Sequence, residues 1–412
     1  MPLLSVADAK ARIDALLSSP ASGPLPSEAV PLDAALAEGR VLRQAVEADA
    51  DSPPFDRSAM DGYAIAERDP GAPYRVVGSV RAGEVFSGGP LAPGTCVRIF
   101  TGGQVPEGTV RVIMQEDAVA EGDTVRFAEA AFADEAPTFV RRRGEEYLRG
   151  ARLLGEGIRI GPVAASVLAT VGVAFPQVSA RPRVAHFVTG GELVPVGAVP
   201  GAGQIRDSNS SLVAGLVAAA GGRLVRQARV GDDQEALRRA LALAVEEGVD
   251  LLLISGGAGA GETDFGRTAL EEAGYAIDFA GVALRPGKPL LFGAHKGSGK
   301  PAFCLPGNPL SHYVVFHLFV RRALERLQGM EPTEQADLVD WDGDPLGEAG
   351  GRETYHPCHW KIVSGRVEAR VLNWTSSGHL ASLGEANGLL VSGGGDEKGT
   401  SGNPRVRLVR WS

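Results

Sequence analysis

Residues 250–264 read DLLLISGGAGAGETD, a short apolar run that breaks into a loop dense in glycine and ends at a carboxylate. Such a run is typical of a buried strand, and the glycines after it let a ligand approach the backbone closely. Exposed backbone N–H groups in such a loop suit anions. Three similar loops also follow apolar runs, HFVTGGE at 186–192, LRPGKP at 284–289 and CLPGNP at 304–309. Together the four loops predict a site for an anionic ligand.

The sequence around these loops alternates strands with helices. VAHFV, RLVRQARV, DLLLIS and PAFCL have the character of strands, and they precede helices predicted at 208–220, 233–247, 263–273 and 310–327. This alternation predicts a mostly parallel, doubly wound sheet with right-handed crossovers. Ligands bind such sheets at the carboxyl ends of the strands, which is where the glycine loops fall.

The remaining sequence predicts three further parts around this domain. Helical spacing of apolar residues at 5–17, with Ser5 as N-cap, contributes to a helical linker region formed by 1–50 and 141–180. Short β-prone runs predict an inserted β domain at 51–140 and a C-terminal β domain at 331–412, with the α/β domain at 181–330. The fold class is therefore multidomain α/β, with a doubly wound ligand-binding domain.

Composition narrows the class of protein. The 412 residues are 44% hydrophobic and 22% charged, which is typical of a folded chain with several domains. A net charge of −9 argues against general binding to nucleic acid or to a membrane surface. Three cysteines without C-x-x-C spacing fit a reducing compartment, and neither a signal peptide nor a membrane span is evident. We expect a cytoplasmic protein.

The common phosphate fingerprints are absent. GSGKP at 297–301 ends in a proline and is more typical of a hairpin turn than of a P-loop, and 256–261 does not match G-x-G-x-x-G. The loop at 255–264 keeps two interpretations. It is either a strand-to-helix turn capped by Thr263 or Asp264, or a ligand loop in which Asp264 binds Mg²⁺ with Glu192 as a second carboxylate.

Two interpretations also stay open for the cationic residues near the loops. Arg285 and Lys288 flank a Pro-Gly turn, so they are either solvated charges or a clamp on an oxyanion. Ser311 stands at a predicted helix start, where its hydroxyl would reach the same oxyanion. RRR at 141–143 is more typical of a solvated face than of a phosphate site.

Taken in order, eight segments resemble the molybdopterin molybdenumtransferase family, which includes bacterial MoeA and the gephyrin E domain. They are PPFDRSAMDGYA, IFTGGQVPEG, RRRGEEYLRGARLL, TGGEL, GQIRDSN, ISGGAGAGETD, RPGKP and PGNPLS, spanning about 50–320. The resemblance implies a homodimer that uses adenylylated molybdopterin and molybdate, with Mg²⁺ or Zn²⁺, to form molybdenum cofactor and AMP. It also implies a molybdopterin adenylyltransferase as upstream partner, and no nucleic-acid or membrane partner.

The resemblance implies a role for each matching residue. Those matching catalytic positions are Asp61, Thr101, Asp232 and Lys288. The pterin and phosphates would be bound by Gly256, Gly257, Gly261, Pro306, Gly307 and Asn308. Molybdate would be bound by Arg285, Lys288, Pro289, Ser311 and Ser377, and the metal by Glu192 and Asp264. Such residues would act mainly by positioning and charge stabilisation.

The sequence departs from the family pattern at several positions. Gly191 stands where Asp is common, Ala258-Gly259-Ala260 replaces Val-Ser-Val, Arg285 replaces Lys, Glu146 replaces Asp and Pro357 replaces Arg. These departures motivate a second hypothesis, a non-catalytic protein that holds molybdopterin or scaffolds partners. A nucleotide pyrophosphatase built on the same α/β domain is a third.

Overall fold

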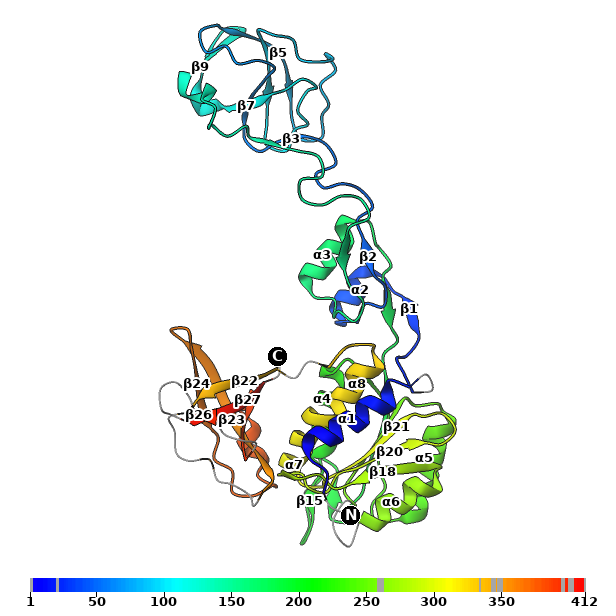
Figure 1. Ribbon diagram of the computed structural model, residues 1–412. Helices are drawn as coiled ribbons and strands as arrows, with labels where there is room; N and C mark the ends of the chain where they lie inside the picture. Colours follow the sequence, from blue (N-terminus) through cyan, green and yellow to red (C-terminus); the bar gives the residue numbers. More distant parts are fainter. Residues whose placement is uncertain are drawn as a thin grey trace. The chain divides into compact units, whose positions relative to one another are not determined.

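The structure is a computed structural model of the 412-residue chain. It describes residues 3–19, 22–257, 263–332, 335–341, 346, 351–393, 397–398 and 404–410. The chain divides into two compact units (Figure 1). The larger unit is Met1–Gln44, Glu156–Ala165 and Phe175–Ser412, and the smaller unit is Ala45–Gly155 and Ser166–Ala174. No helix among the described residues has both the length and the apolarity to cross a membrane.

A six-stranded sheet in the order β16-β13-β17-β21-β20-β18 forms the centre of the larger unit. Its parallel strands are β13 (Arg183–Val188), β16 (Arg223–Arg229), β17 (Leu251–Ser255) and β21 (Pro301–Leu305). The antiparallel strands β18 (Tyr275–Ala280) and β20 (Leu291–His295) complete the sheet. GSGKP forms the turn between β20 and β21, as predicted, whereas the sequence analysis did not predict β18 and β20.

Helices cover both faces of this sheet (Figure 1). One face packs against α1 (Val6–Leu17), α4 (Asn209–Ala219), α7 (Pro309–Val315) and α8 (Arg321–Leu327), and a π-helical turn at Phe316–Val320 joins the last two. The other face packs against α5 (Gln234–Glu246) and α6 (Thr263–Glu272). Successive residues of β17 alternate between the two cores, with Leu251 and Leu253 in the first and Leu252 and Ile254 in the second. The predicted doubly wound fold is confirmed.

The helix boundaries follow from local chemistry. Ser5 caps α1 by accepting a hydrogen bond from the backbone N–H of Asp8 at 3.0 Å, as predicted. In α5, Asp233 accepts from Ala236 N at 2.9 Å. Leu237 and Leu241 of α5 are buried one turn apart, so one stripe of the helix faces the sheet.

The parallel strands lie in the sequence order second, first, third, fourth. The order in which strands are added therefore reverses at β13, because α4 connects it to β16 on one side and α5 returns the chain to β17 on its other side. The loops after β13 and β17 diverge there and leave a crevice at the carboxyl edge of the sheet. This edge holds the glycine loops at 189–191 and 256–257.

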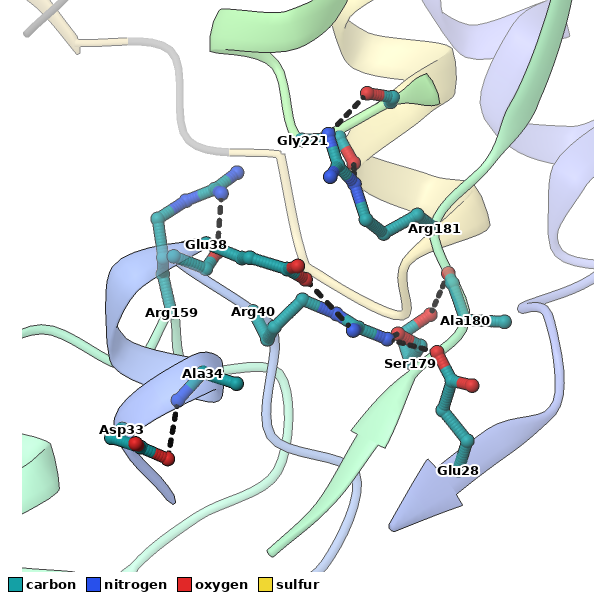
Figure 2. Close-up of polar contacts among 12 residues, drawn as sticks. Glu28, Asp33, Ala34, Glu38, Arg40, Arg159, Ser179, Ala180, Arg181 and Gly221 are labelled. Carbon is teal, nitrogen blue, oxygen red and sulfur yellow. Dashed lines mark hydrogen bonds and ion pairs between the residues drawn. The ribbon is translucent and has the colours of Figure 1, made fainter. Parts of the chain in front are cut away.

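A short sheet pair continues the larger unit beside α2 (Leu32–Ala37). β1 (Ser27–Ala29) pairs with β12 (Gln177–Ser179), and the side chain of Arg40, only 7% exposed, lies against both strands (Figure 2). Arg40 forms ion pairs with Glu28 and Glu38 and donates to the carbonyl of Ser179 at 2.7 Å. These partners satisfy a buried guanidinium and hold the pair together.

A second sheet of the larger unit contains the C-terminal residues. Its order is β19-β23-β25-β27-β22, with β24 on β23 and β26 on β27. The bounds are β19 (Leu284–Arg285), β22 (Gln335–Asp340), β23 (Glu353–Val363), β24 (Arg366–Val371), β25 (Gly388–Ser392), β26 (Glu397–Lys398) and β27 (Pro404–Arg410). β19 belongs to the α/β part of the sequence, so its pairing with β23 joins the two sheets of the unit.

The smaller unit is a β structure. Its six-stranded sheet contains β4 (Gly62–Ile65), β5 (Tyr74–Val80), β6 (Thr95–Ile99), β7 (Arg111–Met114), β8 (Ala118–Glu121) and β9 (Thr124–Phe127), in the order β7-β4-β6-β5-β9-β8. Two short pairs accompany it, β2 (Val46–Glu47) with β11 (Arg152–Leu154) and β3 (Arg57–Ser58) with β10 (Val140–Arg141). Apolar side chains bury both faces of the sheet. α3 (Pro162–Thr170) crosses the boundary between the units.

Candidate functional site

A cavity of about 1120 Å³ lies at the carboxyl ends of β13 and β17, in the larger unit. Its lining comes from the ends of the parallel strands, from the turn after β19 and from the loop after β24. The lining segments are 188–193 without 191, 205–209, 255–257, 284–289, 306–311 without 310, and 374–380 without 379, together with Asp232 and Arg352. All of these residues belong to the larger unit. The crevice expected between strands of opposite winding is therefore present.

Carboxylates line one wall of the cavity. Asp232 accepts a hydrogen bond from the backbone N–H of Gly191 at 2.8 Å. A Cβ at position 191 would lie 2.7 Å from Asp232 Oδ2, and a Cβ at Gly190 would lie 2.8 Å from Glu192 Oε2. The turn has room for these two carboxylates because both of its central residues are glycine.

Two hydrogen bonds to residues of β21 hold the glycine loop after β17. The N–H of Gly256 donates to the carbonyl of Leu305 at 3.1 Å, and Cys304 Sγ donates to the carbonyl of Gly256 at 3.3 Å. Gly256 has φ +90°, and a Cβ there would lie 2.6 Å from Thr189 Oγ1. Only glycine fits this close approach between two loops.

Part of the predicted loop site lies outside the described residues. These are Ala258-Gly259-Ala260, one of the family departures, and Gly261, a predicted phosphate contact. Asp264 is in the first turn of α6, but its side chain is likewise outside the description. The roles of Gly261 and Asp264 stay predictions.

The Pro306-Gly307-Asn308 turn is held on several sides. Asn209 donates to the carbonyl of Gly307 at 2.7 Å, and Asn308 donates to Ser377 Oγ at 2.7 Å. His312 Nδ1 lies 3.2 Å from the carbonyl of Pro306. Burial lowers the pKa of His312 to about 4, so this imidazole is neutral and donates through Nδ1. The turn is thus a fixed part of the cavity wall.

Cationic and hydroxyl side chains also line the cavity. Arg285 and Lys288 are exposed toward the cavity, and among the described residues neither has a carboxylate oxygen within 4.0 Å. The hydroxyl-bearing residues Ser311 and Ser377 line the same cavity, and Ser311 is 4% exposed. Cations without carboxylate partners, beside hydroxyl donors, suit a bound oxyanion.

A buried polar group lies beneath the end of β17. Gln227 Nε2 donates both to the carbonyl of Ser210 at 3.0 Å and to His186 Nδ1 at 2.9 Å. A carbonyl only accepts, so the amide orientation is fixed and His186 Nδ1 is the acceptor. His186 therefore donates through Nε2 to Ser255 Oγ at 2.6 Å. Burial lowers the pKa of His186 to about 3, which keeps this ring neutral.

Asp61 and Thr101 come together in the smaller unit. Asp61 Oδ1 accepts from both the backbone N–H and the hydroxyl of Thr101, each at 2.8 Å. These two hydrogen bonds, the backbone one first, lower the pKa of Asp61. Asp61 and Thr101 therefore contact each other within the smaller unit, whereas the described lining of the cavity belongs to the larger unit. Their catalytic role stays a prediction.

The described residues contain no group of three His, Cys, Asp or Glu side chains placed to hold a metal ion. Glu192 and Asp232 line the cavity with hard oxygen donors. This donor set fits Mg²⁺, which commonly takes one or two carboxylates and completes its shell with water and substrate phosphates. It does not fit a closed structural zinc site.

Sequence reasoning missed several residues of the cavity. Thr189, Arg352 and Trp374 line it without having been singled out. Thr189 follows a predicted strand directly, so its place at the carboxyl edge was a usable signal. No sequence signal marked Trp374, because it is a lone aromatic residue distant in sequence from the glycine loops.

Three family models match the chain in order. The MoeA N-terminal region (domains I and II) matches residues 4–172, a probable molybdopterin binding domain matches 185–326, and the MoeA C-terminal region (domain IV) matches 343–403. These matches define a protein of MoeA architecture and confirm the predicted fold class.

Individual relatives extend over nearly the whole chain. The molybdopterin molybdenumtransferase of Haemophilus influenzae is 34% identical, covering 89% of this chain and 90% of that protein. The one from Nostoc is 33% identical, over 86% and 83%. The crystal structure of the molybdopterin biosynthesis MoeA protein from Pyrococcus horikoshii OT3 is 28% identical with a TM-score of 0.81, covering 100% of each chain. The chain belongs to the molybdopterin molybdenumtransferase family, as the sequence analysis inferred.

Proposed function

We propose that this protein inserts molybdate into adenylylated molybdopterin, releasing AMP and forming molybdenum cofactor. The observation that carries the proposal is one cavity lined both by carboxylates, Glu192 and Asp232, and by cations, Arg285 and Lys288. A substrate with a pyrophosphate and a separate tetrahedral oxyanion needs both kinds of environment. The curated relatives named for this reaction support the assignment.

In the proposed site, the glycine loop at 256–257 and the turn at 306–308 bind the pterin and its phosphates. Backbone amides of glycine-rich turns approach phosphate oxygens without steric hindrance. The fixed positions of Gly256 and Gly307, each anchored by hydrogen bonds, hold the substrate without reorganisation during the reaction.

In this proposal molybdate binds beside Arg285 and Lys288. Pro289, Ser311 and Ser377 line the same cavity as these two cations. Charge-assisted hydrogen bonds from the two cations would hold the oxyanion beside the sulfurs of the pterin. Catalysis then consists mainly of bringing together two anionic reactants that repel each other in water.

Glu192 and Asp232 would hold Mg²⁺, together with Asp264 as the sequence analysis proposes. The ion would withdraw charge from the pyrophosphate and ease cleavage of its P–O bond. Asp232 Oδ2 accepts a hydrogen bond from Gly191 N, so Oδ1 is the oxygen that would bind the ion.

The wider assignment is also part of the proposal. We propose a cytoplasmic homodimer that receives its substrate from a molybdopterin adenylyltransferase, with Asp61 and Thr101 as further catalytic residues. The proposal also includes the four-part division inferred from the sequence, with boundaries at residues 50, 140, 180 and 330.

The direct test is a turnover assay with purified protein, adenylylated molybdopterin, molybdate and Mg²⁺. We expect AMP release that depends on both molybdate and Mg²⁺, and loss of most of it in Asp264→Ala and Lys288→Ala. Tight binding of molybdopterin without AMP release would instead identify a scaffold. Unchanged turnover in both variants would show that the site is elsewhere.

A further inference from the structure

Arg285 and Trp374 contact each other in the lining of the cavity. Arg285 is the last residue of β19, and Trp374 lies in the loop that follows β24. The guanidinium carbon lies 5.5 Å from the centroid of the indole ring. This is within the range of a cation–π interaction, which extends to roughly 6 Å. Both residues line the cavity, so the contact is part of its wall.

The indole ring is fixed in place by its other neighbours. Trp374 is half-buried and packs against the main hydrophobic core of the larger unit. Its ring lies 6.2 Å from that of His356, which contacts Ser392 Oγ at 3.2 Å. Burial, followed by the nearby charge of Arg285, lowers the pKa of His356 to about 4, so this neighbour is neutral. The hydrophobic core and a neutral imidazole therefore pack against the indole that contacts the guanidinium.

The contact leaves the donors of Arg285 available. No carboxylate oxygen among the described residues lies within 4.0 Å of its guanidinium, which contacts the indole of Trp374. A guanidinium is planar and carries its N–H donors around its edge. A contact with an aromatic face therefore leaves these edges open to other ligands. The residues that follow Trp374, Thr375, Ser376 and Ser377, bring hydroxyl groups to the same cavity.

We propose that Trp374 is a positioning residue that orients Arg285 toward the oxyanion substrate. The identity of that oxyanion as molybdate rests on the proposed function. In this proposal Trp374 does not contact the reacting atoms, because it acts through Arg285. The contact also accounts for an arginine at 285, where the family pattern commonly has lysine, since a planar guanidinium stacks on an indole and an ammonium presents a point charge.

The test measures the dissociation constant of inorganic molybdate for the full chain by calorimetry, in wild type, Trp374→Leu, Trp374→Phe, Arg285→Met and the double variant Trp374→Leu/Arg285→Met. Loss of a cation–π contact at a partly exposed site should weaken molybdate binding roughly three- to tenfold in Trp374→Leu. Trp374→Phe keeps an aromatic face and should stay within about twofold of wild type. In the Arg285→Met background, Trp374→Leu should have no further effect.

A matched control comes from a second cation–π pair. The Arg410 guanidinium lies 5.2 Å from the centroid of Trp360, a residue outside the lining of the cavity. Trp360→Leu should leave molybdate affinity unchanged. Thermal unfolding of every variant separates a folding defect from a binding defect.

Two results would overturn the inference. One is an equal effect of Trp374→Leu with and without Arg285, because the residues would then act independently. The other is a loss in Trp374→Phe as large as in Trp374→Leu, because the aromatic face would then be irrelevant. Failure of the proposed function appears separately, as molybdate binding by the wild type without AMP release in the turnover assay.

Discussion

The carboxylate of Asp232 occupies the space beside Gly191 into which any larger residue would project. Gly191 N–H donates to Asp232 Oδ2 at 2.8 Å, and a Cβ on residue 191 would lie 2.7 Å from the same oxygen. The family commonly has Asp at 191 as well as an acidic residue at the position of Asp232, so this chain lacks one of the two carboxylates. The hydrogen bond and the short Cβ distance couple residue 191 to Asp232.

Restoring the family residue should consequently harm this protein. Gly191→Asp adds a crowded side chain and a second negative charge beside Asp232. We expect a loss of stability of about 0.5 kcal/mol, because both residues are exposed and the crowding atom is the end of a side chain, and lower turnover. Chemical unfolding and AMP release measure the two effects. Gly191→Asp/Asp232→Gly should recover part of the stability, whereas equal losses in the single and double variants would contradict the coupling.

Lys288 should matter for molybdate far more than its exposure suggests. It faces the cavity without a carboxylate partner among the described residues, so its charge is available to a ligand. Lys288→Ala should raise the KM for molybdate by about tenfold or more, since it removes a charge-assisted contact. Steady-state AMP release at varied molybdate measures this.

Lys300 provides the control for that experiment. Its ammonium pairs with Asp250 at 2.9 Å and lies outside the cavity lining. Lys300→Ala should leave the KM for molybdate near the wild-type value. A similar rise in both variants would show a general effect of net charge and would contradict a specific role for Lys288.

The sequence predicted much of this fold because its signals were local. Runs such as that of β17 are short, apolar and followed by glycine, and the cap at Ser5 is a single-residue signal. The antiparallel strands β18 and β20 were missed, because YAIDFA and LFGAH carry no comparable pattern and are held in the sheet by their partners.

Residues of the candidate site that lie in sequence motifs could be predicted. Residues that tertiary contacts bring to the site could not. Glu192, Lys288 and Asn308 stand in glycine- or proline-rich turns, and all three line the cavity. Trp374 and the Gln227–His186 contact depend on segments distant in sequence, and no local pattern marks them. The hydrogen bond from Gly191 to Asp232 shows the same limit, since it joins two loops that are distant in sequence.

The hydrogen bond between Asn308 and Ser377 should contribute to both stability and binding. Asn308 Nδ2 donates to Ser377 Oγ at 2.7 Å and ties the turn at 306–308 to the loop after β24. Ser377→Ala and Asn308→Ala should each cost about 1 kcal/mol of unfolding free energy, and the double variant should cost less than their sum. Chemical denaturation of the four proteins tests this, and strict additivity would show that the two side chains do not interact.

Stability should fall as the pH drops from neutral, because buried imidazoles must stay uncharged. Burial lowers the pKa of His312 to about 4, below its ordinary value of 6.5. Its neutral form is thus favoured in the folded state, and the unfolded chain binds more protons between these two pH values. The contribution is fully present above pH 6.5 and is lost progressively as the pH falls toward 4.

Thermal unfolding between pH 7 and pH 5 measures this dependence. His186, with a pKa lowered to about 3, contributes in the same direction, so the wild type should lose stability steadily across the window. His312→Leu cannot take up a proton at this position, so its melting temperature should depend less on pH, even if it is lower at pH 7. His359→Gln changes an exposed histidine and serves as the control. A pH dependence in His312→Leu as steep as that of the wild type would show that His312 does not contribute, because acid would then act through other groups.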